Sequence, residues 1–218
     1  MTTTARSIIE RAHVQLQDVD GVRWPAYELV AWLNDAQRAY VQQRPDQKCT
    51  TQAVPLTQGF RQTIPAEALS LMDIPNNSTG AMRRITKVDL LTLDSVLPAW
   101  RSLAPASQVT HFIHDLREPR AFLVYPPAVA GTQVDMTYSL YPVDLPVPAL
   151  GGPASTVTGN IDLPDHAADA LLNFVLYKAY SKDAEFGGNS QLAASYLALF
   201  NAAVGSQLQS TATVAPQT

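Results

Sequence analysis

The spacing of apolar residues changes twice along the chain, and this constrains the fold more than any other feature. In residues 1–44, and again from Asp165 to about Leu208, apolar residues recur at intervals of three and four, as on one face of an α-helix. Between Lys48 and Tyr141, short runs separated by turn-forming residues are typical of β-strands. Helices, then strands, then helices predict an α+β protein.

Local signals divide each helical region into two helices. Thr3 or Thr4 can cap the first helix, and the second opens at Trp24-Pro25, with proline at a favoured first-turn position. Arg44-Pro45 ends the second helix, because the residue before a proline disfavours the helical conformation. Gly187-Gly188 separates the last two helices. We expect the N- and C-terminal helix pairs to form one helical bundle that carries a β-rich insertion.

The predicted boundaries follow these signals. The helical bundle takes residues 1–47 and 160–208, the β-rich insertion residues 48–159, and a flexible C-terminal tail residues 209–218. Within the insertion we expect one hairpin from 48–56 with 60–64 and another from 109–114 with 121–125. Residues 133–141 alternate apolar and polar side chains and predict the clearest strand, before a connector rich in proline and glycine.

Charge and cysteine content exclude several classes of protein. The formal net charge is −4, from 15 Lys and Arg against 19 Asp and Glu, whereas proteins that bind nucleic acid tightly carry a basic face. The single cysteine, Cys49, rules out an intrachain disulfide. No apolar run is long enough to span a bilayer, and the first residues do not resemble a secretion signal. We therefore expect a soluble protein with no membrane association.

Candidate catalytic and metal-binding patterns are weak. His111 and His114 are the most metal-like pair, but a strand turns residues three apart to opposite faces. Asp18-Val19-Asp20-Gly21 lacks the further ligands of a calcium loop and predicts a helix-terminating turn. Cys49 has no evident neighbouring base, and the glycine-rich phosphate loops and the serine nucleophile motif are absent. The sequence predicts no enzyme, no metal site and no cofactor.

Two groups of residues are candidate contacts with a protein partner. Arg83, Arg84 and Lys87 form the only tight basic cluster, which is either a solvated strand edge or a contact for an acidic patch. In the uncharged C-terminal tail the candidates have side chains suited to strand pairing or polar contact; they are Gln209, Thr211, Thr213 and Val214. Such a tail cannot bury enough surface to fold alone, so a partner would order it.

The order of these segments resembles a known family, the bacteriophage head-to-tail adaptor (connector) proteins, including the tail-tubular type of short-tailed phages. Four stretches carry the resemblance, and they are Leu16-Gln17-Asp18 with Val22-Arg23-Trp24, Glu28-Leu29 and Trp32-Leu33-Asn34-Asp35; Leu56 with Gly59, Arg61-Gln62 and Ile64-Pro65; His111 with Asp115, Pro119-Arg120 and Val124-Tyr125-Pro126-Pro127; and Leu176-Tyr177 with Ala179-Tyr180-Ser181-Lys182-Asp183-Ala184-Glu185-Phe186.

The resemblance implies a structural virion protein, assembled in the host cytoplasm and placed at the head-tail interface. Members of the adaptor family form a ring, usually dodecameric, that joins the portal protein to the tail or nozzle protein. The genome passes through this ring during ejection without specific binding. The alternatives are a tail terminator or tail-tube ring protein and, from another class, a ligand- or peptide-binding module that uses the β-rich insertion.

Overall fold

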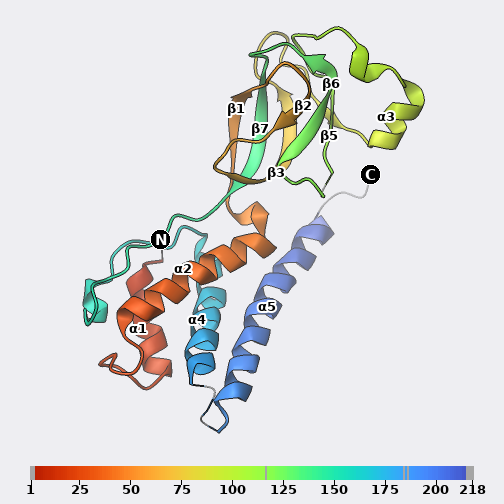
Figure 1. Cartoon of the computed structure of the whole chain (residues 1–218). Helices are drawn as coiled ribbons and strands as arrows, with labels where there is room; N and C mark the ends of the chain where they lie inside the picture. The colour runs from red at the N-terminus through yellow and green to blue at the C-terminus, as the bar shows by residue number, and fades with distance from the viewer. Residues whose placement is uncertain (1–2, 116, 184, 186, 215–218) are drawn as a thin grey trace. The chain divides into compact units, whose positions relative to one another are not determined.

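The computed structural model describes residues 3–115, 117–183, 185 and 187–214, with the backbone alone for residues 206–214 (Figure 1). The chain forms two compact units. One contains Met1–Gln47 and Pro142–Thr218 and is helical, and the other contains Lys48–Tyr141 and is rich in β-strands. The α+β class predicted from the sequence is confirmed.

The helical unit contains α1 (Ala5–Gln15), α2 (Ala26–Gln43), α4 (Ala168–Lys182) and α5 (Asn189–Val214), with short 3-10 helices at Pro45–Gln47, Ala154–Thr156 and Asp165–Ala167. The hydroxyl of Thr4 caps α1 by accepting from the Ser7 N–H at 3.2 Å. Pro25 directly precedes α2, and Arg44, before Pro45, ends it. Local chain signals therefore set these boundaries.

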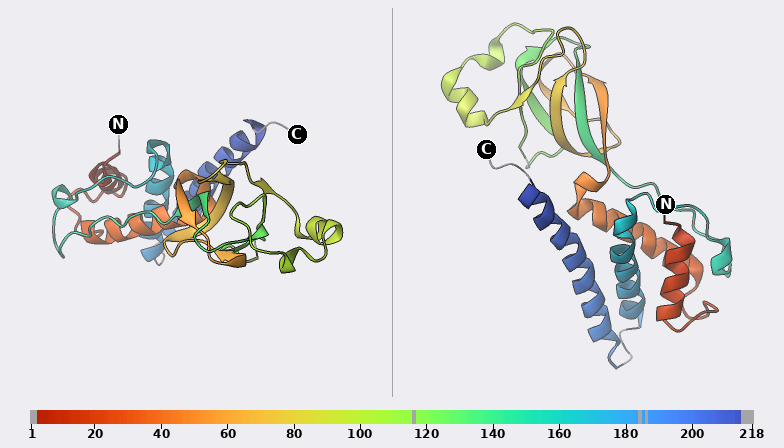
Figure 2. Two further views of the ribbon diagram at one scale, coloured as in Figure 1. Left: turned by 90° about the horizontal axis from the view of Figure 1, so that it is seen from above. Right: turned by 180° about the vertical axis from the view of Figure 1, so that it is seen from behind.

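The prediction of a bundle built from an N-terminal and a C-terminal helix pair is wrong. α4 is the central helix of this unit: α5 packs along one side of it, and both α1 and α2 contact it, with α2 contacting α4 more extensively than it contacts α1 (Figure 1 and Figure 2). α4 buries side chains around much of its circumference, namely Ala168, Ala170, Leu171, Leu172, Val175, Leu176 and Ala179. A fifth helix, α3 (Leu90–Val96), belongs to the β-rich unit. The apolar stripes showed that each helix buries a face, but not which helix covers it.

The turn between α1 and α2 is held by the carboxylate of Asp18. It accepts hydrogen bonds from the backbone N–H groups of Val22 (3.0 Å), Arg23 (2.9 Å) and Trp24 (2.8 Å). Burial alone would raise the pKa of Asp18, but these donors outweigh it and hold the pKa below its ordinary value. The indole Nε1 of Trp24 donates to the Ala179 carbonyl of α4 at 3.3 Å. The aspartate thus positions the tryptophan that anchors this turn to α4.

The connector over residues 142–159, assigned to the insertion from the sequence, belongs to the helical unit. Asn34 of α2 donates through Nδ2 to the Leu145 carbonyl (3.0 Å) and accepts from the Leu145 N–H (2.9 Å). Gln37, one turn later, accepts from the Asp162 N–H at 2.8 Å. Both amide side chains are buried. Proline and glycine content predicts irregular backbone, but it does not show which unit supplies the hydrogen-bond partners.

The end of α2 is fixed by an ion pair. The guanidinium of Arg44 is 2% exposed and donates to Asp46 through Nε (2.8 Å) and a terminal nitrogen (2.7 Å). Hydrogen bonding from Arg44 holds the pKa of Asp46 below its ordinary value, against the opposing effect of burial. A depressed pKa in the folded protein stabilises it above the unfolded-state pKa of about 3.9, and that contribution is lost as the pH falls.

Asp46→Asn is therefore expected to lower the Tm at pH 7, with the difference from the parent protein shrinking as the pH falls below about 4. Thermal unfolding from pH 7 to pH 2.5 measures this. Asp169→Asn is the matched control, because its ion pair with Arg11 has a carboxylate that is 80% exposed. A pH-independent difference for Asp46→Asn would contradict the assignment.

The described residues of the β-rich unit form seven strands in two sheets: β1 (Cys49–Pro55), β2 (Gly59–Thr63), β3 (Ala68–Asn77), β4 (Thr86–Lys87), β5 (His111–Ile113), β6 (Ala121–Ala128) and β7 (Gln133–Leu140). The sheet orders are β1-β7-β3 and β2-β6-β5-β4. A bridge between Asn76 and Arg84 connects the β3 and β4 edges. The strand predicted over 133–141 and the hairpin of β5 with β6 are confirmed.

The hairpin predicted from 48–56 and 60–64 is wrong. β1 pairs with β7 and β2 pairs with β6, both antiparallel, so these sequence neighbours enter different sheets. The buried amide of Gln62 holds the intervening turn. It donates to the carbonyls of Thr57 (2.8 Å) and Gly59 (2.9 Å) and accepts from the Thr57 N–H (2.8 Å). Glycine at Gly59 is required by its φ of +110°. Short chain separation favoured a hairpin, but burial of the inward side chains decided the pairing.

The buried side chain of Asn77 fixes a second irregular region. Its Nδ2 donates to the carbonyls of Arg83 (3.0 Å) and Val109 (2.8 Å), and its Oδ1 accepts from the Val109 N–H (2.8 Å). At 1% exposure, no bulk water is available to replace these bonds. The residue therefore connects the end of β3 to the segment that leads into β5.

Asn77→Ala is expected to destabilise the β-rich unit by about 2–3 kcal/mol, because it leaves buried backbone groups without partners. Chemical denaturation of the full chain measures this. Thr79→Ala, two residues away at an exposed position, should change the free energy of unfolding by less than about 0.5 kcal/mol. Equal effects of the two substitutions would show that the Asn77 bonds contribute little.

Candidate interaction surfaces

The three basic residues singled out from the sequence lie in the segment that leads from β3 into β4. The Arg83 carbonyl accepts from the Asn77 N–H at 3.0 Å, Arg84 forms the bridge to Asn76, and Lys87 ends β4. All three side chains are exposed. Lys87 also lines a cavity, whereas Arg83 and Arg84 do not. The lysine is therefore part of the cavity lining, whereas the two arginines lie on the exposed surface outside this cavity.

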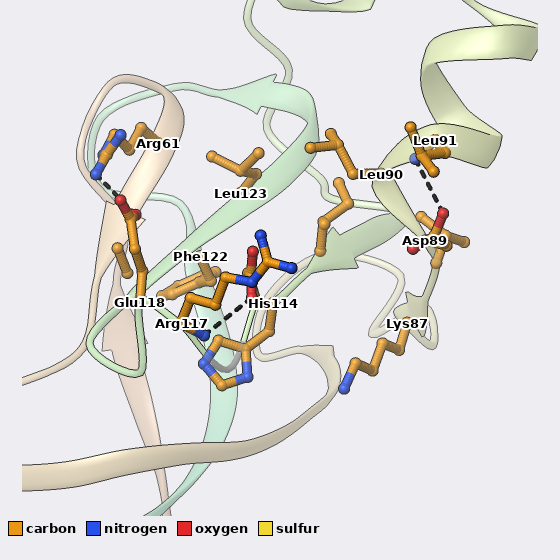
Figure 3. A pocket seen from close by; sticks show the side chains of 14 residues that line it. Arg61, Lys87, Asp89, Leu90, Leu91, His114, Arg117, Glu118, Phe122 and Leu123 are labelled. Atoms are coloured by element: carbon orange, nitrogen blue, oxygen red, sulfur yellow. Dashed lines mark hydrogen bonds and ion pairs between the residues drawn. The ribbon is translucent and has the colours of Figure 1, made fainter.

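The cavity that includes Lys87 has a volume of about 1040 Å³ and lies between the start of α3 and the β5–β6 hairpin (Figure 3). Its apolar lining includes Leu90, Ile113 and Leu123. These residues belong to a cluster on the face of the β2-β6-β5-β4 sheet that α3 covers. The cavity thus continues an apolar cluster to the surface.

Carboxylates of the cavity lining have partners within the protein. Glu118 accepts from Arg61 at 2.9 Å, Asp89 caps α3 by accepting from the Leu91 N–H at 3.0 Å, and Asp115 accepts from the Arg117 backbone N–H at 2.9 Å. By contrast, the side chains of Lys87 and Arg117 form no ion pair or hydrogen bond with any described residue. Two cationic groups of this cavity are therefore available to a ligand.

His114 lies in the same cavity (Figure 3). Its Nε2 is buried and has no hydrogen-bond partner among the described residues. Burial lowers the pKa of His114, the charge of Lys87 adds to that effect, and a hydrogen bond with the Pro119 backbone opposes it. Because proline has no N–H, the ring donates this bond, and Nδ1 is the donor because Nε2 has no partner. The neutral ring then presents an acceptor lone pair at Nε2.

His111 and His114 have different surroundings. His111 lies on β5, bonds through Nδ1 to the Thr86 hydroxyl at 2.6 Å and stacks on Tyr125, whereas His114 lies beyond the end of the strand. Within the described ranges, no three His, Cys, Asp or Glu side chains are grouped to hold a metal ion. Cys49 is exposed at the start of β1. Nor does any helix in the described part of the chain have the length and apolar character of a membrane span.

In the helical unit, α5 presents a face without charge. No charged residue occurs from Gly187 to Thr218. On the α4 side, Phe200 contacts Phe174 with ring centroids 5.1 Å apart, and Tyr196 stacks on Tyr180 at 5.6 Å. Away from α4, Leu192 is 43% exposed and Leu199 is 52% exposed. An uncharged helix face with exposed leucines is typical of a surface that contacts another protein.

The C-terminal candidate residues lie on α5 rather than on an extended tail. The sequence placed the helix end near Leu208, whereas α5 continues to Val214, so the backbones of Gln209, Thr211 and Thr213 are helical. Their side chains, and residues 215–218, lie outside the described part. β-propensity at Thr211, Thr213 and Val214 suggested strand pairing, but a weak local preference does not outweigh continuation of an existing helix.

Several structural residues had no detectable signal in the sequence. Arg117 lies in a turn, where an isolated arginine is ordinary, and His114 was considered only as a metal ligand. The buried amides of Asn34, Gln62 and Asn77 look like surface residues in a single sequence. Asn34 and Gln62 lie in stretches that carried the family resemblance, at Asn34-Asp35 and Arg61-Gln62, whereas Asn77 does not. The structure shows that all three amides bond to backbone groups.

Comparison with known families decides the assignment. The family model described as SU10 adaptor protein matches residues 3–218, nearly the whole chain. The chain belongs to the SU10 adaptor protein family. The resemblance to phage head-to-tail adaptors is thereby confirmed, and the protein is a phage structural adaptor and a component of the virion. No curated protein matches the chain.

The adaptor family implies association with other head or tail proteins of the phage. The exposed surfaces described above are where such contacts can form. They are the cavity beside α3, the exposed arginines before β4 and the uncharged face of α5.

Proposed function

We propose that this adaptor forms a dodecameric ring at the head-tail interface, between the portal protein and the tail or nozzle protein. The observation that carries the proposal is the adaptor family match over residues 3–218. Each subunit of a closed ring contacts its two neighbours through two different surfaces. The chain offers two such surfaces on different units: the uncharged face of α5 and the exposed arginines before β4.

The charge balance supports a channel through which DNA passes without being held. Proteins that grip DNA neutralise its phosphates with lysine and arginine and release counterions. This chain carries a net charge of −4, with a low charged fraction of 16%. A ring of such subunits carries net negative charge and would not hold the phosphates of the genome, so DNA could slide through its lumen during ejection. No enzymatic step is part of this function.

The portal contact is proposed for the end of α5. An uncharged helix can place one face in an apolar groove of a partner, as amphipathic helices do. Helical recognition replaces strand pairing for Gln209, Thr211, Thr213 and Val214, because their backbones lie in α5. Arg83 and Arg84 are proposed to contact an acidic patch of a neighbouring protein. In a ring, many weak copies of these contacts act together and gain by avidity.

Imaging of intact particles tests the proposal. Reconstructions of the head-tail interface are expected to show this chain as a symmetric ring directly below the portal. A ring at the far end of the head-tail assembly or along a tail tube would instead identify a tail terminator or tail-tube protein. A single copy per particle would contradict ring formation.

A further inference from the structure

We propose that the cavity beside α3 binds a short segment of another protein in which carboxylates flank an apolar side chain. The site lies within the β-rich unit. The inference depends neither on a ring nor on the contacts of α5, so it goes beyond the function proposed above. Three features of the cavity identify the chemistry of its ligand.

The first feature is a pair of cationic side chains that have no partner among the described residues. Glu118, Asp89 and Asp115 already accept hydrogen bonds from protein donors, whereas the side chains of Lys87 and Arg117 form none with described residues. Lys87, Arg117 and His114 line the same cavity (Figure 3). Carboxylates on a ligand would form ion pairs with these two side chains.

The second feature is the apolar floor. Ile113 is 6% exposed, and Leu90 and Leu123 are half-buried around it. An incoming leucine-sized side chain would remove this floor from water, and burial of such a side chain contributes about 1.5–3 kcal/mol. A volume of about 1040 Å³ accommodates a peptide segment rather than one side chain.

The third feature is the acceptor at Nε2 of His114. This buried atom has no partner among the described residues. A peptide carries regularly spaced N–H donors next to its side chains, so a backbone N–H of the bound segment can satisfy the imidazole once the His114 ring turns to expose Nε2 to the cavity. Neither free phosphate nor a nucleic-acid backbone carries an apolar group that could cover the floor.

The carboxylates of the lining also disfavour a polyanion. Asp89, Asp115 and Glu118 remain negatively charged after they accept their hydrogen bonds, and they surround the two free cations. A densely charged strand would meet repulsion here, whereas a peptide with spaced carboxylates can place each of them on Lys87 or Arg117. The ligand class is therefore an acidic, apolar peptide segment.

The experiment uses the full chain and the peptide acetyl-Asp-Leu-Asp-Leu-Asp-amide as the probe. Titration followed by NMR is expected to shift the His114 imidazole signals together with the amides of Ile113 and Leu123. Lys87→Glu with Arg117→Glu is expected to weaken binding about tenfold, because two attractive contacts become repulsive. Arg6→Glu with Arg11→Glu makes the same charge change on the exposed surface of the helical unit and should leave the affinity within about twofold.

Further probes separate this site from general electrostatics. The peptide with serine in place of leucine should bind more weakly, and inorganic phosphate or a short single-stranded oligonucleotide should not shift His114. Equal loss in both double variants, binding of phosphate or DNA in place of the peptide, or no shift at His114 would overturn the proposal. If the charge reversal unfolds the protein, Lys87→Gln with Arg117→Gln supplies the same comparison. Failure here leaves the ring untouched, since particle imaging tests that separately.

Discussion

Deletion of residues 209–218 is expected to leave the subunit folded and to abolish its attachment to DNA-filled heads. The deletion removes only the last part of α5, beyond the contacts of Phe200 and Tyr196 with α4. Packing of the helical unit should therefore persist, with little change in circular dichroism or Tm. The proposed portal contact would be lost at the same time, and a ring multiplies this loss over its copies.

A variant that retains the helix sharpens this test. Gln209→Ala, Thr211→Ala, Thr213→Ala and Val214→Ala together keep or raise helix propensity while removing the candidate side chains. We expect the same loss of attachment, measured as the yield of infectious particles. Normal yield from the truncated protein would show that this segment is dispensable and that the portal contact lies elsewhere.

Trp100→Ala is expected to destabilise the β-rich unit by about 3–5 kcal/mol, the usual cost of truncating a buried tryptophan. Trp100 is 1% exposed and contacts Phe60 and Tyr125 edge to face, with ring centroids 5.6 and 6.3 Å away. Its Nε1 donates to Asp94 at 2.7 Å, which ties the segment after α3 to that helix. The side chain thus holds α3 and its connecting segments on the sheet.

Amide hydrogen exchange on the full chain measures this effect by unit. Exchange in β5 and β6 should accelerate strongly, whereas α4, which lies in the other unit, serves as the internal reference and should change little. Asp94→Asn is the matched control, because it keeps the ring contacts and weakens only the polar ones. If Trp100→Ala and Asp94→Asn accelerate exchange equally, the aromatic packing is not the main stabilising contact.

Local backbone chemistry was readable from the sequence. Thr4, Pro25 and Pro45 mark helix ends because capping hydroxyls and the fixed φ of proline act on adjacent residues only. Alternation over β7 reported a strand with one buried face, and low charge with one cysteine excluded whole classes of protein. The family resemblance was also present in the residues, and the family match confirmed it.

Which surfaces meet was decided by the tertiary structure. Periodicity reports that α4 buries side chains, but not that it does so against α1, α2 and α5 at once, and so the expected bundle of helix pairs was wrong. Chain proximity favoured a β1–β2 hairpin, whereas burial of a common core between two sheets paired them with β7 and β6.

The polar residues illustrate the same division most clearly. In the sequence, Asn34, Gln62 and Asn77 are ordinary amides, and Lys87, His114 and Arg117 are scattered polar groups. Folding brings distant backbone carbonyls and N–H groups to the amides, and it places the other three residues around one cavity. Among the described residues, the Lys87 and Arg117 side chains and Nε2 of His114 have no partner there. A hydrogen bond or a binding site requires particular groups to meet in space. The sequence lists those groups, but only the tertiary structure decides which of them meet.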